Sequence, residues 1–122
     1  MEADNVLKEM SDQIEGFITC AVVGMDGLSI ASFSRNKKTD TEAISAQMTL
    51  LLKLVETSVN KLGAGTIEDD LLTTESAYVL MRFLKDRGFY MAIAADRKTA
   101  KLGNMRLNSR IYADRLSKVM PH

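Results

Sequence analysis

The sequence predicts an α+β domain in which one antiparallel sheet of five strands is flanked by helices. The first observation is length, because 122 residues suffice for one hydrophobic core. The second is element order, which is helix, two strands, helix, three strands, helix. The third is the absence of internal repeats and of any Gly/Ser/Pro-rich linker. One sheet flanked by helices accommodates this order, so residues 1–122 are expected to form a single domain.

The first elements are a short helix and a hairpin. Residues 4–14 carry apolar side chains at helical spacing, with Asp4 as the expected N-cap and Gly16 as the stop. Residues 17–23 are apolar and partly β-branched. Asp26-Gly27 is a turn signal, and residues 28–33 then alternate, so these segments predict two antiparallel strands.

Gly24 and Gly27 also suggest a phosphate-binding loop. Such a loop lies between a strand and the N-terminus of a helix, where free amides and the helix dipole bind the anion. Here the two glycines lie between two predicted strands, and the Lys-Ser or Lys-Thr pair of a Walker-type motif does not come directly after them. The hairpin is therefore the favoured interpretation.

The remaining elements are a long helix, three strands and a closing helix. Thr39 and Glu42 have capping-box spacing, and Gly63 is the expected end of the helix over 39–62. Three strands joined by short turns are predicted over residues 67–74, 78–84 and 89–94. The apolar spacing in residues 99–120 predicts the last helix, which Pro121 stops.

The central helix carries more apolar surface than one sheet needs. The stripe expected to face the sheet comprises Ile44, Met48, Leu51, Val55, Val59 and Leu62. A second row comprises Ala43, Ala46, Leu50, Leu54 and Thr57. The arc expected to be solvated comprises Ser45, Thr49, Lys53, Glu56 and Asn60, with Leu52 on its border. The second row packs either on another helix of the chain or on a second copy. Burying a leucine contributes roughly 1.5–3 kcal/mol, which favours the homodimer.

Composition excludes several functions. The 16 basic and 16 acidic residues give no net charge, so no attraction to nucleic acid is built in. One cysteine, Cys20, fits a reducing, cytoplasmic location, and no apolar run approaches the roughly 20 residues of a membrane span. The only histidine is the terminal His122, so we expect no catalytic site, metal site or cofactor. The basic last helix could bind phosphate groups, but we favour charge pairing between this helix and the acidic first helix.

Several stretches together resemble the roadblock/dynein light chain family, particularly its single-domain bacterial and archaeal members. The most specific is "VVGMDGLSIAS", and the others are "VNKLGAG", "LLTTESAYVLMRF", "GFYMAIAA" and "KLGNMRLNSRIYADRL". The resemblance covers nearly the whole chain. It implies a profilin-like fold with the long helix on one face of the sheet and the other two helices on the opposite face.

The resemblance also implies a function. Family members are typically dimers whose long helices pair and whose third strands join, which would place Leu71 and Thr73 in the interface with the second row. Such dimers commonly bind Ras-like small GTPases, preferably with GTP bound. The MglB-like group stimulates hydrolysis by repositioning the GTPase's own catalytic groups. We expect the GTPase to dock on Thr49, Leu52, Lys53 and Glu56. The alternatives are a dimeric scaffold without effect on hydrolysis and, less favoured, a ligand-binding sensor.

Overall fold

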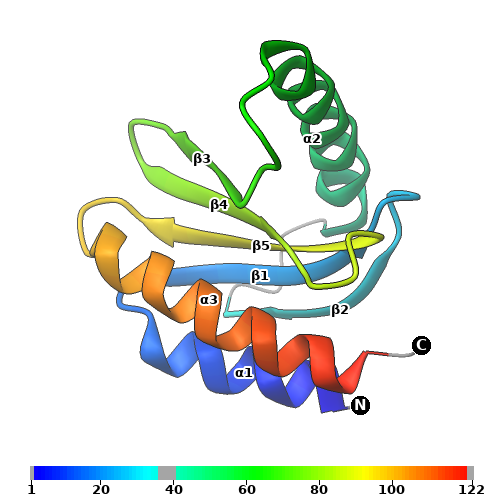
Figure 1. The fold of residues 1–122 in the computed structure, drawn as a ribbon. Helices are drawn as coiled ribbons and strands as arrows, with labels where there is room; N and C mark the ends of the chain where they lie inside the picture. The colour runs from blue at the N-terminus through cyan, green and yellow to red at the C-terminus, as the bar shows by residue number, and fades with distance from the viewer. Residues whose placement is uncertain (1, 36–40, 121–122) are drawn as a thin grey trace.

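The chain folds with its elements in the predicted order (Figure 1). The computed structural model describes residues 2–35 and 41–120. The elements are α1 (Glu2–Gln13), β1 (Phe17–Gly24), β2 (Ser29–Ser34), α2 (Thr41–Leu62), β3 (Asp69–Thr73), β4 (Ala77–Phe83), β5 (Phe89–Asp96) and α3 (Leu102–Val119). The predicted capping box depends on Thr39, which lies outside the described residues.

The five strands form one antiparallel sheet in the order β2-β1-β5-β4-β3. Helix α2 covers part of one face, and α1 and α3 lie side by side on the other (Figure 1). This three-layer arrangement confirms the predicted fold class. Because β2 and β3 are the edge strands, each has one side that pairs with no other strand of the described chain.

Two hydrophobic cores lie on opposite faces of the sheet, and strand β1 contributes to both. Cys20 and Val22 belong to the core under α1 and α3, whereas Ala21 and Val23 belong to the core under α2. This alternation follows from the two-residue period of a strand. Burial raises the pKa of the Cys20 thiol to about 12, as expected for an inert core cysteine.

The β1–β2 connection is the predicted hairpin turn and not a phosphate loop. Gly27 adopts a φ of 89°, a conformation that side chains with a Cβ rarely adopt. Its backbone N–H donates to the Gly24 carbonyl over 2.9 Å, and the Leu28 N–H donates to Asp26 Oδ1 over 3.0 Å. The second strand begins at Ser29, so the predicted range of 28–33 was shifted by one residue.

The contacts of α1 correct one prediction and confirm another. Asp4 is not the N-cap, because the helix already begins at Glu2 and the Asp4 carboxylate accepts the Ser32 N–H over 3.3 Å. The acidic α1 does pair with the basic α3, through an ion pair between Glu9 and Arg115. The hydrogen bond from Arg115 is the main reason that the pKa of Glu9 is lowered.

Candidate functional site

Helix α2 presents an unexpected set of residues to the sheet. Ser45, Thr49 and Leu52 are the buried ones, with exposed fractions of 4%, 2% and 1%. Thr49 Oγ1 donates to the Ser45 carbonyl over 2.7 Å and lies 2.8 Å from the hydroxyl of the fully buried Tyr90. Because a buried tyrosine hydroxyl requires a hydrogen-bonding partner, polar residues of α2 face the sheet here.

This rotation of α2 corrects the predicted docking surface. Thr49 and Leu52 were expected to be outward, but both are buried and cannot contact a partner on the surface. Lys53 is exposed as predicted. Glu56 is half-buried and forms an ion pair with Arg87, 2.9 Å from its guanidinium. Only Lys53 therefore remains a freely exposed member of the predicted set.

Arg87, in the β4–β5 turn, fixes the C-terminal half of α2 to the sheet. Besides pairing with Glu56, it donates to the Ile67 carbonyl over 3.1 Å. Its guanidinium carbon lies 3.9 Å from the centre of the Phe83 ring, a cation–π contact. One side chain thus joins α2, the segment before β3 and the end of β4. The sequence offered no signal for this role.

The second apolar row of α2 is exposed. Leu50 and Leu54 have exposed fractions of 63% and 65%, and Ala43 and Ala46 are exposed beside them. We call these four residues the α2 ridge. The alternative of packing on another helix of the chain is wrong, because α1 and α3 cover the opposite face of the sheet (Figure 1). Two residues of the predicted sheet-facing stripe, Ile44 and Leu62, are also exposed.

An apolar trough lies beside α2, where the sheet is uncovered. Its volume is about 360 Å³. The lining includes Ile18, Ile44, Met48, Val79, Ala92 and Ala94, from α2 and strands β1, β4 and β5. The trough and the α2 ridge together leave a large amount of apolar surface in contact with water, which is typical of an interaction site.

The edge strand β3 borders this face. Leu71 packs against the core under α1 and α3, and Thr73 is exposed. The neighbouring Asp70 has a buried Oδ2 atom without a hydrogen-bond partner among the described residues. Burial, followed by repulsion from Asp69, raises the pKa of Asp70. The residue pattern of the strand contains no signal for this unsatisfied oxygen, because it depends on the burial of Asp70 in the folded chain.

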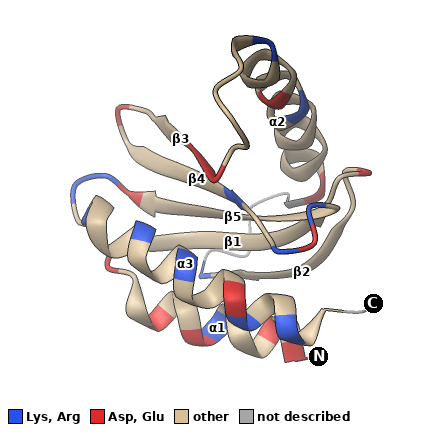
Figure 2. Ribbon diagram, viewed as in Figure 1, with Lys and Arg blue, Asp and Glu red and all other residues tan. Residues whose placement is uncertain are grey.

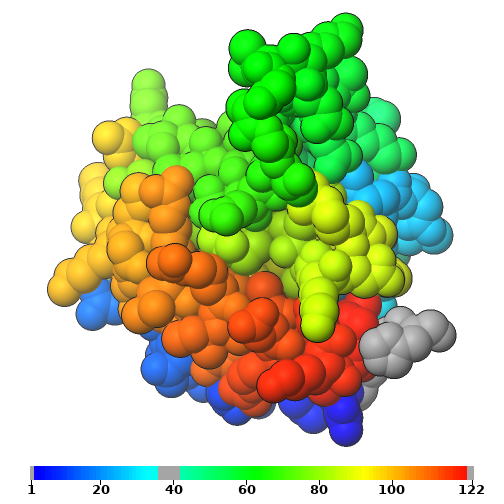
Figure 3. Space-filling model, in the orientation of Figure 1, coloured from blue at the N-terminus to red at the C-terminus, as the bar shows by residue number. Residues whose placement is uncertain are grey.

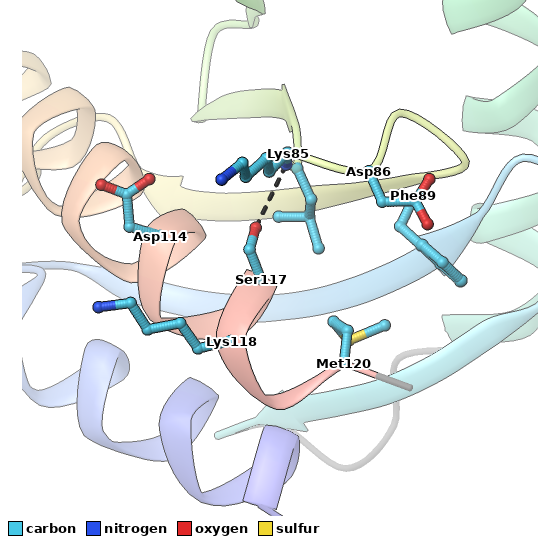
Figure 4. A pocket seen from close by; sticks show the side chains of 8 residues that line it. Lys85, Asp86, Phe89, Asp114, Ser117, Lys118 and Met120 are labelled. Carbon is cyan, nitrogen blue, oxygen red and sulfur yellow. Dashed lines mark hydrogen bonds between the residues drawn. The ribbon is translucent and has the colours of Figure 1, made fainter. Parts of the chain in front are cut away.

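A second cavity lies between the β4–β5 turn and the end of α3 (Figure 4). It has a volume of about 750 Å³. Leu84, Phe89 and Met120 form its apolar side, and Lys85, Asp114 and Lys118 surround the rest. No group of three potential metal ligands occurs in the described part of the chain. The Ser117 hydroxyl, which also lines the cavity, accepts the Lys85 N–H over 3.2 Å and donates to the Ala113 carbonyl over 2.9 Å, so its hydrogen bonds are with the backbone.

The fold and the α2 face define a class: a profilin-like α+β domain with an uncovered apolar helix and sheet face. The Roadblock/LC7 domain model matches residues 3–95, so the chain belongs to this family. A comparison with curated proteins found no match. Among the described residues, no helix is both long enough and apolar enough to cross a membrane.

Solved structures share this fold. MglB of Myxococcus xanthus aligns with a TM-score of 0.88 and 16% identity, covering 98% of this chain and 94% of that chain. MglC of the same organism aligns with a TM-score of 0.70 and 21% identity, covering 98% and 100%. Profilin II of Acanthamoeba castellanii aligns with a TM-score of 0.58 and 18% identity, covering 84% and 86%. At these low sequence identities, the structural similarity shows a shared fold.

Proposed function

We propose that this chain is a non-enzymatic, dimeric regulator of a Ras-like small GTPase in the cytoplasm. The observation that carries the proposal is the exposed α2 ridge beside the apolar trough. Membership of the Roadblock/LC7 family and the structural likeness to MglB support the choice of a GTPase as partner. The regulator acts on the GTP-bound form and repositions the catalytic groups of the GTPase.

The dimer forms through the face that α2 leaves uncovered. A second copy of α2 fills the trough with its own apolar side chains, while the edge strands β3 pair and bring Leu71 and Thr73 close to the interface. Burying Leu50 and Leu54 contributes roughly 1.5–3 kcal/mol each, doubled by the two-fold symmetry. Water is removed from apolar surface on both copies.

Leu54→Glu tests the dimer, because it places a charge without a partner among apolar side chains. We expect this variant to be a monomer by light scattering. Lys53→Glu is the matched control, since it places the same carboxylate one residue away on the polar side of α2, and it should remain a dimer. A Leu54→Glu variant that is still dimeric would exclude the α2 ridge from the interface.

The GTPase docks on the polar side of α2 that the dimer leaves exposed, with Lys53 as the first residue to test. Immobilised protein is incubated with cell extract in the presence of GDP or a non-hydrolysable GTP analogue, and retained proteins are identified by mass spectrometry. We expect a Ras-like GTPase that is retained only with the GTP analogue, and weaker retention by Lys53→Glu. Equal retention by Lys53→Glu would remove this surface from consideration.

Regulation is tested by single-turnover GTP hydrolysis with the captured GTPase. Faster hydrolysis in the presence of the wild-type chain, and not of Leu54→Glu, supports the regulator. A GTPase that binds without any change in hydrolysis indicates the dimeric scaffold instead. Retention of other proteins regardless of nucleotide contradicts the choice of partner.

A further inference from the structure

The cavity between the β4–β5 turn and the end of α3 has a charged end and an apolar end. We call it the α3 cavity; its lining includes Leu84, Lys85, Phe89, Asp114, Lys118 and Met120. Its volume of about 750 Å³ lies within the range of roughly 300–1,000 Å³ that is typical of small-molecule sites. In the space-filling view it lies between the yellow-green β4–β5 turn and the orange-to-red surface of α3 (Figure 3). No residue of the α2 ridge or of the trough lines it.

Hydrogen bonds of the backbone fix the walls of the α3 cavity. The Lys85 N–H donates to Ser117 Oγ over 3.2 Å and so joins the turn to α3 (Figure 4). Within the turn, the Leu84 N–H donates to the Phe89 carbonyl over 3.0 Å, and the Phe89 N–H donates to the Asp86 carbonyl over 3.1 Å. The cavity is therefore preformed, and a ligand does not have to order the turn when it binds.

The charged end of the α3 cavity carries more cations than anions. Figure 2 shows basic positions in both walls, and in Figure 4 the side chains of Lys85 and Lys118 lie on the same side of the cavity as Asp114. None of these three side chains forms an ion pair within the part of the chain that the structure describes. One carboxylate does not neutralise two ammonium groups, so a positive charge remains at this end. Asp86 does not balance it, because its carboxylate accepts the Gly88 N–H over 2.9 Å and lies at the other end (Figure 4).

The apolar end of the α3 cavity suits a hydrocarbon chain. Leu84 and Met120, with exposed fractions of 3% and 5%, form its closely packed base. Phe89 is half-buried and presents further apolar surface. The methylene groups of Lys85 and Lys118 add to this surface, because a lysine side chain is apolar up to its ammonium group. A ligand with an anionic head and an aliphatic tail therefore matches both ends.

We propose that the α3 cavity binds a medium-chain aliphatic carboxylate. The carboxylate lies between the ammonium groups of Lys85 and Lys118, and the aliphatic chain lies against the Phe89 ring. Asp114 lowers the affinity, because its own carboxylate competes for the two ammonium groups. The site is separate from the proposed dimer and GTPase surfaces, so it gives the domain a small-molecule ligand in addition to its proposed protein partners.

Three probes distinguish the contributions of the head and the tail. Octanoate, butyrate and octylamine are each titrated into isotope-labelled protein, and binding is followed by amide chemical shifts. Butyrate has the same head as octanoate and a shorter tail, whereas octylamine has a similar tail and a cationic head. Octanoate should bind at least about tenfold more tightly than either, which corresponds to about 1.4 kcal/mol. The largest shifts are expected at Lys85, Phe89 and Ser117.

Charge variants identify the residues that bind the head. Lys85→Glu and Lys118→Glu should each weaken octanoate binding about tenfold and strengthen octylamine binding. Asp114→Asn should strengthen octanoate binding, because it removes the competing carboxylate. Lys98→Glu makes the same change of net charge outside the α3 cavity and should leave both affinities unchanged. Circular dichroism checks that each variant is folded.

Two kinds of result overturn the proposal. The first is that millimolar octanoate shifts no amide of the α3 cavity, or shifts only residues of the trough such as Ala92 and Ala94. The second is that octylamine binds as tightly as octanoate, or that Asp114→Asn does not bind octanoate more tightly than the wild type. Repeating the titration with Leu54→Glu separates this result from the fate of the proposed dimer, since the α3 cavity contains no residue of the α2 ridge.

Discussion

Leu52 and Leu54 lie two residues apart on α2, but truncating each to alanine should affect stability in a different way. Leu52 is 1% exposed in the core under α2, and Leu54 is 65% exposed on the α2 ridge. Truncating a fully buried leucine costs about 2–5 kcal/mol, because apolar contact is lost and a cavity remains. Truncating an exposed leucine changes the stability of a lone chain by only about 0.5 kcal/mol. Leu52→Ala should therefore remove a large part of the free energy of unfolding, which for a domain is about 5–15 kcal/mol in total.

Urea denaturation at low and high protein concentration distinguishes the two variants. Leu52→Ala lowers the free energy of unfolding at both concentrations, since its packing lies within one chain. Leu54→Ala weakens the proposed dimer, so its effect is small where the chains are monomeric and grows as protein concentration rises, because the wild type gains more stability from association than the variant does. Equal losses for the two variants, independent of concentration, would refute both the assigned rotation of α2 and the role of the ridge.

Further predictions concern Tyr90, Cys20 and Arg87. Tyr90→Phe removes the buried hydroxyl and should cost about 1 kcal/mol of unfolding free energy. In the wild type, burial raises the pKa of Tyr90, so an absorbance titration should show this phenol ionising at a higher pH in the folded chain than in the unfolded chain. The Cys20 thiol has a pKa of about 12 in the folded chain against an ordinary 9.0, so the unfolded chain loses its proton first and stability should fall as pH rises from 9.0 towards 12. A thiol reagent at pH 8 should label native protein far more slowly than unfolded protein. Arg87→Lys keeps the charge beside Glu56 but loses the stacking on Phe83, and a lower melting temperature is expected; an unchanged one would show that the stacking contributes nothing.

The fold was predictable because its signals are local. The Asp26-Gly27 turn, the alternation of the strands and the spacing of apolar residues gave every element in order. Element ends were less predictable: α3 begins at Leu102 and not at residue 99, because the Thr99 and Ala100 N–H groups close a turn on the Asp96 carbonyl. Such contacts depend on where β5 ends, and a pattern of residue types does not contain them.

The rotation of α2 was not predictable from its own sequence. Apolar residues occupy so much of the helix that several orientations bury a similar stripe. The orientation is set by Tyr90, which is distant in sequence and whose hydroxyl hydrogen-bonds with Thr49 and with the Ser45 carbonyl. Ser45 and Thr49 therefore face the sheet, while Lys53 of the same polar arc stays exposed. Thr49 and Leu52 were misplaced for this reason. The exposed row with Leu50 and Leu54 was identified correctly as surface beyond the needs of the sheet.

Strand β1 contributes side chains to both hydrophobic cores, and this limits where residues can be inserted or deleted in the domain. Cys20 and Val22 face one core while Ala21 and Val23 face the other, so deleting one residue would exchange the two sets and disturb both cores together. Residues 63–66, by contrast, are exposed between α2 and β3 and are constrained by neither core. Insertions and deletions among relatives should therefore collect in this connection, while β1 varies by substitution alone.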